Sequence, residues 1–304
     1  MKRILLDTDM GVDCDDAVAL ALTLKAENAG LAELVGVTAS TTRRGAVATV
    51  NAICRYYGKL KPVGVAARKI PCDDLNAYAS ACADKFGESD TAEPAVKLMR
   101  RLLAGSNGKV TLVAIGPLLN VADLLRSGAD EYSPLSGEEL VEEKLDEVFI
   151  MGGSFAANNA AAGGKSVSVC AEWNILQDVE SAQYVVKTLR RPVVFVPHEA
   201  GEFVFTRKGE GDNPVWYAMQ KFAEHNGDDM SRPVRRYSWD PITCMSVVYD
   251  LSRWFALSPY GEVTVTDEGV TEFAEGEGNA RFLMLRGGAD VYASLGEYID
   301  ELMK

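Results

Sequence analysis

The sequence has no apolar run that approaches the ~20 residues a membrane-spanning helix needs. Its first residues hold an apolar core of only three, Ile4 to Leu6, before an acid, whereas a secretory signal needs about 7–15. The six cysteines are scattered, without a C-x-x-C pair, which favours reduced thiols. We therefore predict a soluble cytoplasmic protein that does not act at a membrane.

Positive charge and histidine are also scarce. The chain has 31 Lys and Arg against 44 Asp and Glu, a net charge of -13, and two histidines. A surplus of negative charge of this size repels phosphate backbones, so nucleic acid is not the expected partner. The same charge favours a metal cation or a neutral or cationic small molecule.

Short apolar runs alternate with amphipathic runs along most of the 304 residues. We expect strands at 3–7, 33–39, 62–66, 109–115, 144–151 and 192–197, and helices at 15–28, 45–57, 92–105, 178–190 and 213–225, with one more opening at 116–117. This order predicts an α/β fold with an open, mainly parallel sheet flanked by helices, in one domain covering 1–304.

The C-terminal part has a different pattern. We expect a helix after Asp240-Pro241, a β pair formed by 262–266 and 281–285, and a last helix from Asp290. Residues 68–91 lack clear periodicity and residues 154–169 are rich in small residues, and we expect both to be long loops that border a ligand crevice.

An acidic segment separates the first expected strand from the first expected helix. Five carboxylates lie within ten residues, namely Asp7, Asp9, Asp13, Asp15 and Asp16. Carboxylates at this density repel each other unless some are protonated or a cation neutralises them, and oxygen ligands suit Ca²⁺ or Mg²⁺. Acids at a helix start also cap free N–H groups, but capping explains only one or two of the five. The segment therefore indicates a metal-binding or catalytic site.

The acidic segment resembles the N-terminal motif of the nucleoside hydrolases, D-x-D-P-G-x-D-D, with two residues inserted and Met10 in place of proline. Further motifs of that family are matched in order by 109–120, 149–153 (Phe-Ile-Met-Gly-Gly), 171–175 (Ala-Glu-Trp-Asn-Ile) and 239–241 (Trp-Asp-Pro). The resemblance spans nearly the whole chain. It implies a Rossmann-like core, an active site at the carboxyl ends of the strands, and assembly into a homodimer or homotetramer.

The resemblance implies Ca²⁺-dependent hydrolysis of the N-glycosidic bond of a ribonucleoside or related riboside, which gives free ribose and base. It assigns the metal to Asp9, Asp16, the main-chain carbonyl of Ile115, and Asp240. Asp9 would also act as general base on water. Ribose hydroxyls would be bound by Asp15, Glu172 and Asn174. The positive charge that develops on the sugar explains the need for so many carboxylates.

Three positions depart from the family pattern. Trp239 stands where the best-known group has a histidine that protonates the leaving base; tryptophan can stack on a base but cannot transfer a proton at neutral pH. Thr42 and Ser166 stand where the family has asparagine.

Other candidates for a proton donor are few. We expect a structural role for His198, a surface helix-end position for His225 and a backbone-bonded hydroxyl for Tyr237. Arg43 and Arg44 are expected to be solvated surface residues.

Two alternatives stay open. The strand followed by Asp7-Thr8-Asp9 is similar to the start of haloacid-dehalogenase-like phosphohydrolases, although the later acid pair of that class is not visible. Without an obvious leaving-group acid, the protein is also compatible with a catalytically impaired nucleoside- or ribose-binding protein.

Overall fold

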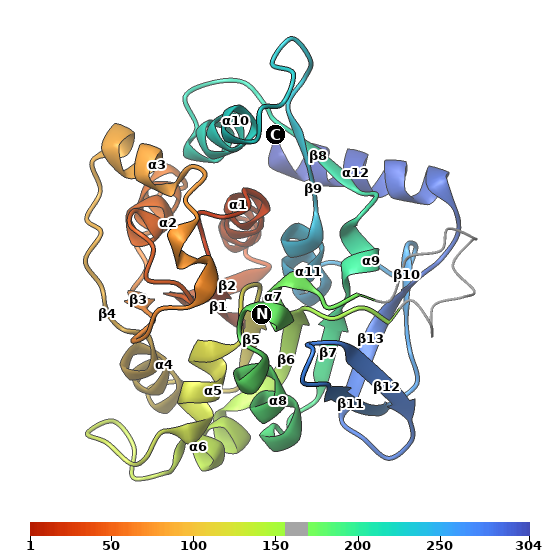
Figure 1. The fold of residues 1–304 in the computed structure, drawn as a ribbon. Helices are drawn as coiled ribbons and strands as arrows, with labels where there is room; N and C mark the ends of the chain where they lie inside the picture. Colours follow the sequence, from red (N-terminus) through yellow and green to blue (C-terminus); the bar gives the residue numbers. More distant parts are fainter. Residues whose placement is uncertain (156–169) are drawn as a thin grey trace.

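The computed structural model describes residues 1–155 and 170–304, which form a central sheet with helices on both faces (Figure 1). The sheet has 11 strands in the described residues, in the order β12-β11-β13-β7-β6-β5-β1-β2-β3-β4, with β10 paired to β13. Neighbours from β13 to β4 are parallel, whereas β10, β11 and β12 add antiparallel pairs. These strands are β1 (Lys2–Thr8), β2 (Ala32–Ala39), β3 (Val63–Val65), β4 (Glu93–Pro94), β5 (Val110–Ala114), β6 (Leu145–Met151), β7 (Val193–Val196), β10 (Phe255–Leu257), β11 (Gly261–Val265), β12 (Thr271–Glu275) and β13 (Ala280–Leu285).

Most of the core lies in two large clusters, one on each face of the sheet, and a small third cluster contains Ala66, Ile70, Cys72 and Leu119. Along β1, Ile4 and Leu6 point to one cluster and Leu5 to the other, as the alternation of a strand requires. The first face is covered by α1 (Asp15–Asn28), α2 (Ala46–Tyr56), α10 (Pro214–Asn226), α11 (Trp239–Val248) and α12 (Ala289–Met303). The second face is covered by α4 (Ala95–Ala104), α5 (Leu119–Arg126), α6 (Gly137–Lys144) and α8 (Val179–Thr188).

The predicted α/β fold with a mainly parallel sheet is confirmed, and the predicted helices and strands up to 226 match the observed ones within a few residues. The predicted β pair of 262–266 with 281–285 is confirmed in part: β11 and β13 are antiparallel neighbours, but they are in register only at Gly261 and Ala280, and a strand that was not predicted lies between them in the sequence. The intervening strand β12 pairs with β11, with Val263 opposite Phe273, while β13 joins the parallel sheet beside β7. Cross-strand packing of these apolar side chains stabilises the hairpin.

The expected loop 68–91 is also partly wrong, because it contains a short 3₁₀ helix (Pro71–Asp74) and α3 (Ala79–Phe86). The expected loop 154–169, which includes Ser166, lies outside the described residues from 156 onward. A small separate sheet is formed by β8 (Phe205–Arg207) and β9 (Arg235–Tyr237), which the sequence patterns did not indicate. Across the described ranges 1–155 and 170–304, every helix is too short or too polar to traverse a lipid bilayer.

The order of the strands explains where a ligand would bind. The chain adds strands on one side of β1 through β2, β3 and β4, and on the other side through β5, β6 and β7. The carboxyl ends of β1 and β5 therefore lie at a topological switch point, where adjacent connections diverge and leave a crevice. The acidic segment follows β1, so it lies at this crevice.

Candidate active site

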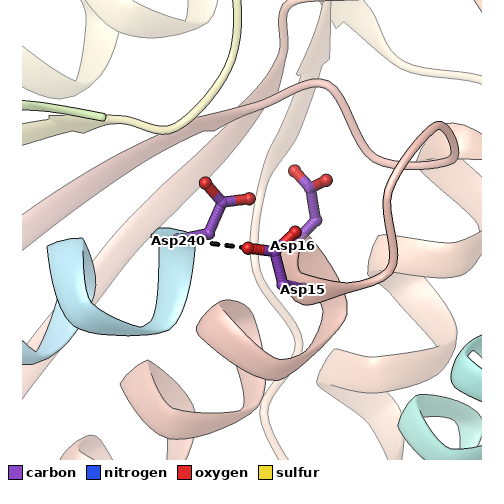
Figure 2. Close-up of side chains that lie close together, drawn as sticks. All are labelled: Asp15, Asp16 and Asp240. Atoms are coloured by element: carbon purple, nitrogen blue, oxygen red, sulfur yellow. Dashed lines mark hydrogen bonds between the residues drawn. The ribbon is translucent and has the colours of Figure 1, made fainter. Parts of the chain in front are cut away.

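Three buried carboxylates from distant parts of the chain meet at the crevice (Figure 2). Asp15 and Asp16 begin α1, and Asp240 lies in the first turn of α11. One oxygen of each lies within 4.8 Å of the others. The main-chain N–H of Asp240 donates to Asp15 Oδ2 at 3.1 Å. The packing of α1 on α11 thus brings together a cluster of oxygen ligands of the kind that hard divalent cations prefer.

Asp7 and Asp9 extend this acidic group along the end of β1. Asp7 Oδ1 accepts hydrogen bonds from Asn120 Nδ2 at 2.8 Å and Thr38 Oγ1 at 2.5 Å. Asp7 Oδ2 is buried and has no hydrogen-bond partner in the described part of the chain. The negative charge of Asp9 raises the pKa of both Asp16 and Asp240. The predicted ligands Asp16 and Asp240 thus lie together with Asp15, and Asp9 interacts with them electrostatically.

Burial and mutual repulsion raise the pKa of all these groups. Burial raises the pKa of Asp7 to about 7 and that of Asp9 to about 6. The pKa of Asp15, Asp16 and Asp240 is raised well above the usual range, first by burial and then by the neighbouring acids. A divalent cation would remove this repulsion, so the residues present fit a metal ion.

The end of β5 lies directly against Asp9. A Cβ on Gly116 would lie 2.8 Å from the nitrogen and 2.9 Å from the Cβ of Asp9, so a glycine is needed at this contact. The carbonyl of Ile115 accepts a hydrogen bond from Asn174 Nδ2 at 3.3 Å, and Met151 O accepts one from the same nitrogen at 3.2 Å. Asn174 therefore links the ends of β5 and β6 next to the acidic group.

Glu172 is fixed by main-chain donors at the start of α7 (Trp173–Gln177). Its Oε1 accepts from Asn174 N at 2.9 Å, and its Oε2 accepts from Ile175 N and Gly153 N, each at 3.2 Å. Burial raises the pKa of Glu172 to about 7 although these donors lower it. The helix start thus holds a carboxylate in one orientation beside the acidic group.

Trp239 lies at the beginning of α11, directly before Asp240, and is part of an aromatic cluster. Its Nε1 donates to His198 O at 2.8 Å, and its indole stacks on the His198 ring with centroids 5.4 Å apart. The Arg236 guanidinium lies 5.3 Å from the indole centroid.

His225 is exposed in the last turn of α10, as expected for a surface helix-end residue.

The two residues inserted in the acidic segment include Asp13, which pairs with Arg236. The Nε of Arg236 lies 2.8 and 3.0 Å from the two carboxylate oxygens, and Nη2 also donates to Oδ2. This ion pair joins the acidic segment to β9, which ends two residues before Trp239. No sequence signal indicated it, because the partners are 223 residues apart.

The expectation that Arg43 is a solvated surface residue is wrong. Arg43 is 4% exposed and donates to the carbonyls of Asp9 at 2.7 Å, Met10 at 3.2 Å and Cys72 at 2.8 Å, and to that of Leu75. The guanidinium is buried, and its several N–H groups satisfy these carbonyls together.

Arg44 is solvated as expected and pairs with the exposed Asp84.

We expect Arg43→Met to lower the free energy of unfolding by about 3 kcal/mol or more, because it leaves several buried carbonyls without donors. The neighbouring Arg44→Met should change it by less than about 0.5 kcal/mol. Urea unfolding followed by circular dichroism measures both. Equal, small changes would show that Arg43 does not hold the acidic segment.

This combination of an open, mainly parallel sheet and a buried carboxylate cluster at its switch point defines an α/β protein with a candidate metal-dependent active site. The chain belongs to the inosine-uridine preferring nucleoside hydrolase family, whose model matches residues 4–280.

Curated relatives carry related names. The pyrimidine-specific ribonucleoside hydrolase RihA of Enterobacter sp. (strain 638) is 32% identical over 198 residues, which cover 61% of this chain and 56% of the relative. RihB of Escherichia coli O17:K52:H18, also named a pyrimidine-specific ribonucleoside hydrolase, is 26% identical over 206 residues, 64% of this chain and 59% of the relative. The chain thus matches less than two thirds of the length of these relatives.

Solved structures show the same fold over the whole chain. The inosine-uridine preferring nucleoside hydrolase from Bacillus anthracis has a TM-score of 0.70 at 20% identity, covering 100% of this chain and 99% of that one. A structure described as an inosine-guanosine nucleoside hydrolase has a TM-score of 0.72 at 17% identity, covering 100% and 98%.

Proposed function

We propose that the protein hydrolyses the N-glycosidic bond of a ribonucleoside or related riboside and releases free ribose and free base. The observation that carries this proposal is the buried group of carboxylates at the carboxyl ends of β1 and β5, in a chain of this family. The ribonucleoside hydrolase names of the curated relatives support it.

We propose Ca²⁺ as the cofactor, held by Asp9, Asp16, Asp240 and the carbonyl of Ile115. The all-oxygen donor set and the repulsion among the buried acids support a hard divalent cation. When bound, the ion would lower the pKa of a water molecule and polarise sugar hydroxyls.

The side chains of this chain then have distinct tasks. Asp9 lies at the end of β1 against Gly116. Its match to the general base of the family motif assigns it the proton of the attacking water. Asp15 and Asn174 bind ribose hydroxyls. Glu172, oriented by three main-chain N–H groups, also binds a ribose hydroxyl, and its negative charge stabilises the positive charge that develops on the sugar.

A panel of ribosides and deoxyribosides tests the proposal, with free base and free sugar both measured, with and without added Ca²⁺. Release of ribose and base from at least one riboside is expected. Phosphate release from a generic phosphomonoester would instead support the phosphohydrolase alternative. Tight binding of nucleosides without base release would support the impaired binding protein.

The metal leads to a prediction about stability. In chelated protein, the free energy of unfolding should fall as the pH rises from about 4 to about 7. An unfolded carboxyl has a pKa near 4, whereas Asp7 and Glu172 have values of about 7 in the folded state. The folded state therefore binds more protons in this window and loses stability as they dissociate.

Added Ca²⁺ should raise the Tm more at pH 8 than at pH 5, because the ion binds the deprotonated carboxylates of the folded protein. Differential scanning calorimetry with and without chelator measures this effect, and metal analysis of the purified protein accompanies it. An unchanged Tm at both pH values, with no metal detected, would contradict the cofactor proposal.

Three further expectations from the sequence stay predictions. These are a single domain over 1–304, a cytoplasmic location, and assembly into a dimer or tetramer. Size-exclusion chromatography with light scattering measures the last of them.

A further inference from the structure

His198 is linked by hydrogen bonds to two parts of the proposed site. Its main-chain N–H donates to Gly153 O at 2.9 Å, and the N–H of Gly153 donates to the carboxylate of Glu172. Its carbonyl accepts from the indole of Trp239, which directly precedes Asp240. The backbone of His198 is therefore fixed between the proposed sugar-stabilising acid and a proposed metal ligand.

The His198 imidazole is held in one position, with its Nδ1 atom buried. The ring stacks on Trp239, with an angle of 26° between the planes. Nδ1 is buried and faces Glu202 Oε2 at 3.9 Å, and neither atom has a hydrogen-bond partner among residues 1–155 and 170–304. The side chain is still 30% exposed. Because Nδ1 is covered, the edge that carries Nε2 is the one available to a ligand.

The indole of Trp239 is already engaged. It contacts His198 and the Arg236 guanidinium, and a Cβ on Gly201 would lie only 2.5 Å from its Cδ1. Its N–H is used in the bond to His198 O. These contacts give Trp239 a second task besides any contact with the base, which is to hold the histidine ring in place.

Other groups are poorly suited to protonate a leaving base. Asp7 is fully buried. Both carboxylate oxygens of Glu172 accept hydrogen bonds from main-chain N–H groups, which occupy both oxygens and hold the side chain in one orientation. His225 is exposed in the last turn of α10, near the exposed Glu224.

We propose that His198 is the proton donor to the leaving base, an inference that rests on the proposed function. The C1′–N bond breaks and its electron pair stays with the base, which takes the proton from Nε2 of the imidazolium. Water adds to C1′ and gives its proton to Asp9. Neutral base and ribose leave, after which Asp9 releases a proton to solvent and His198 takes one up.

The experiment compares two substrates that differ in their need for an acid. The base of inosine, hypoxanthine, is a poor leaving group unless it is protonated. The nitrophenolate of p-nitrophenyl riboside is a good leaving group without protonation. We expect His198→Phe, which keeps an aromatic ring against Trp239, to lower kcat for inosine by about 10²-fold. The rate with p-nitrophenyl riboside should stay within about threefold of the wild type, since that step needs no acid.

His198→Gln should give the same pattern, and it provides a second variant if the phenylalanine is not accepted by the fold. His225→Phe is the matched control and should leave both rates unchanged. A wild-type rate on inosine in His198→Phe, or an equal loss with both substrates, would overturn the proton-donor role and leave only a packing role. A wild-type protein that cleaves neither substrate would instead overturn the proposed function itself.

Discussion

Replacing Asp9 by asparagine is expected to lower kcat/KM for inosine by about 10²–10⁴-fold, the usual contribution of a well-placed general base. Loss of a proposed metal ligand adds to this effect. The fold should survive, because the Asp9 main-chain carbonyl, which accepts the Arg43 hydrogen bond, is unchanged. Steady-state kinetics measure the loss, and circular dichroism and metal analysis show whether structure and metal are retained.

Two control variants sharpen this result. Asp84→Asn removes an exposed carboxylate that pairs with Arg44 and is no proposed ligand, so it should not change activity. Asp13→Asn weakens the ion pair with Arg236 but removes no proposed ligand, so its loss should be much smaller than that of Asp9→Asn. Equal losses at Asp9 and Asp13 would mean that the acidic segment is wrongly aligned with the family motif.

2′-Deoxyinosine is expected to be cleaved about 10⁴–10⁵-fold less efficiently than inosine, as in other sites built to bind a substrate hydroxyl. Asp15 and Asn174, the proposed hydroxyl ligands, are 2% and 6% exposed. Without the 2′-hydroxyl, these polar groups stay buried with an unpaired atom, which costs far more than the loss of an apolar contact.

The measurement is kcat/KM for both nucleosides, with 5′-deoxyinosine as the control substrate because it keeps the 2′- and 3′-hydroxyls. The control should be cleaved much more efficiently than 2′-deoxyinosine. Comparable rates on inosine and 2′-deoxyinosine would contradict the proposed ribose contacts and the assignment of a ribohydrolase.

The sequence by itself determined the order of strands and helices and the position of the acidic segment. Buried parallel strands leave continuous apolar runs, and helices leave a 3.6-residue period, so both are visible locally. α1 was predicted with its observed bounds, 15–28. Several short motifs in the correct order also indicated the family before any contact was known.

Only the tertiary structure decided which side chains meet. Asp240 lies 225 residues from Asp15 along the chain, and Arg236 lies 223 residues from Asp13, yet each pair is joined by a hydrogen bond. Arg43 follows a strand in a polar run, and nothing local distinguishes it from its solvated neighbour Arg44. Its burial results from the inward carbonyls of two other segments, 9–10 and 72–75.

The same reason explains His198 and β12. A histidine after a strand carries no sign of its partner, and the stack on Trp239 exists only because α9 (His198–Gly201) and the start of α11 pack against each other. β12 is stabilised as a strand because Phe273 lies opposite Val263 on the neighbouring strand β11 and packs against it. Local sequence patterns indicate the backbone conformation and the burial of a segment. Which residue pairs with a charged or aromatic side chain depends instead on how distant segments pack.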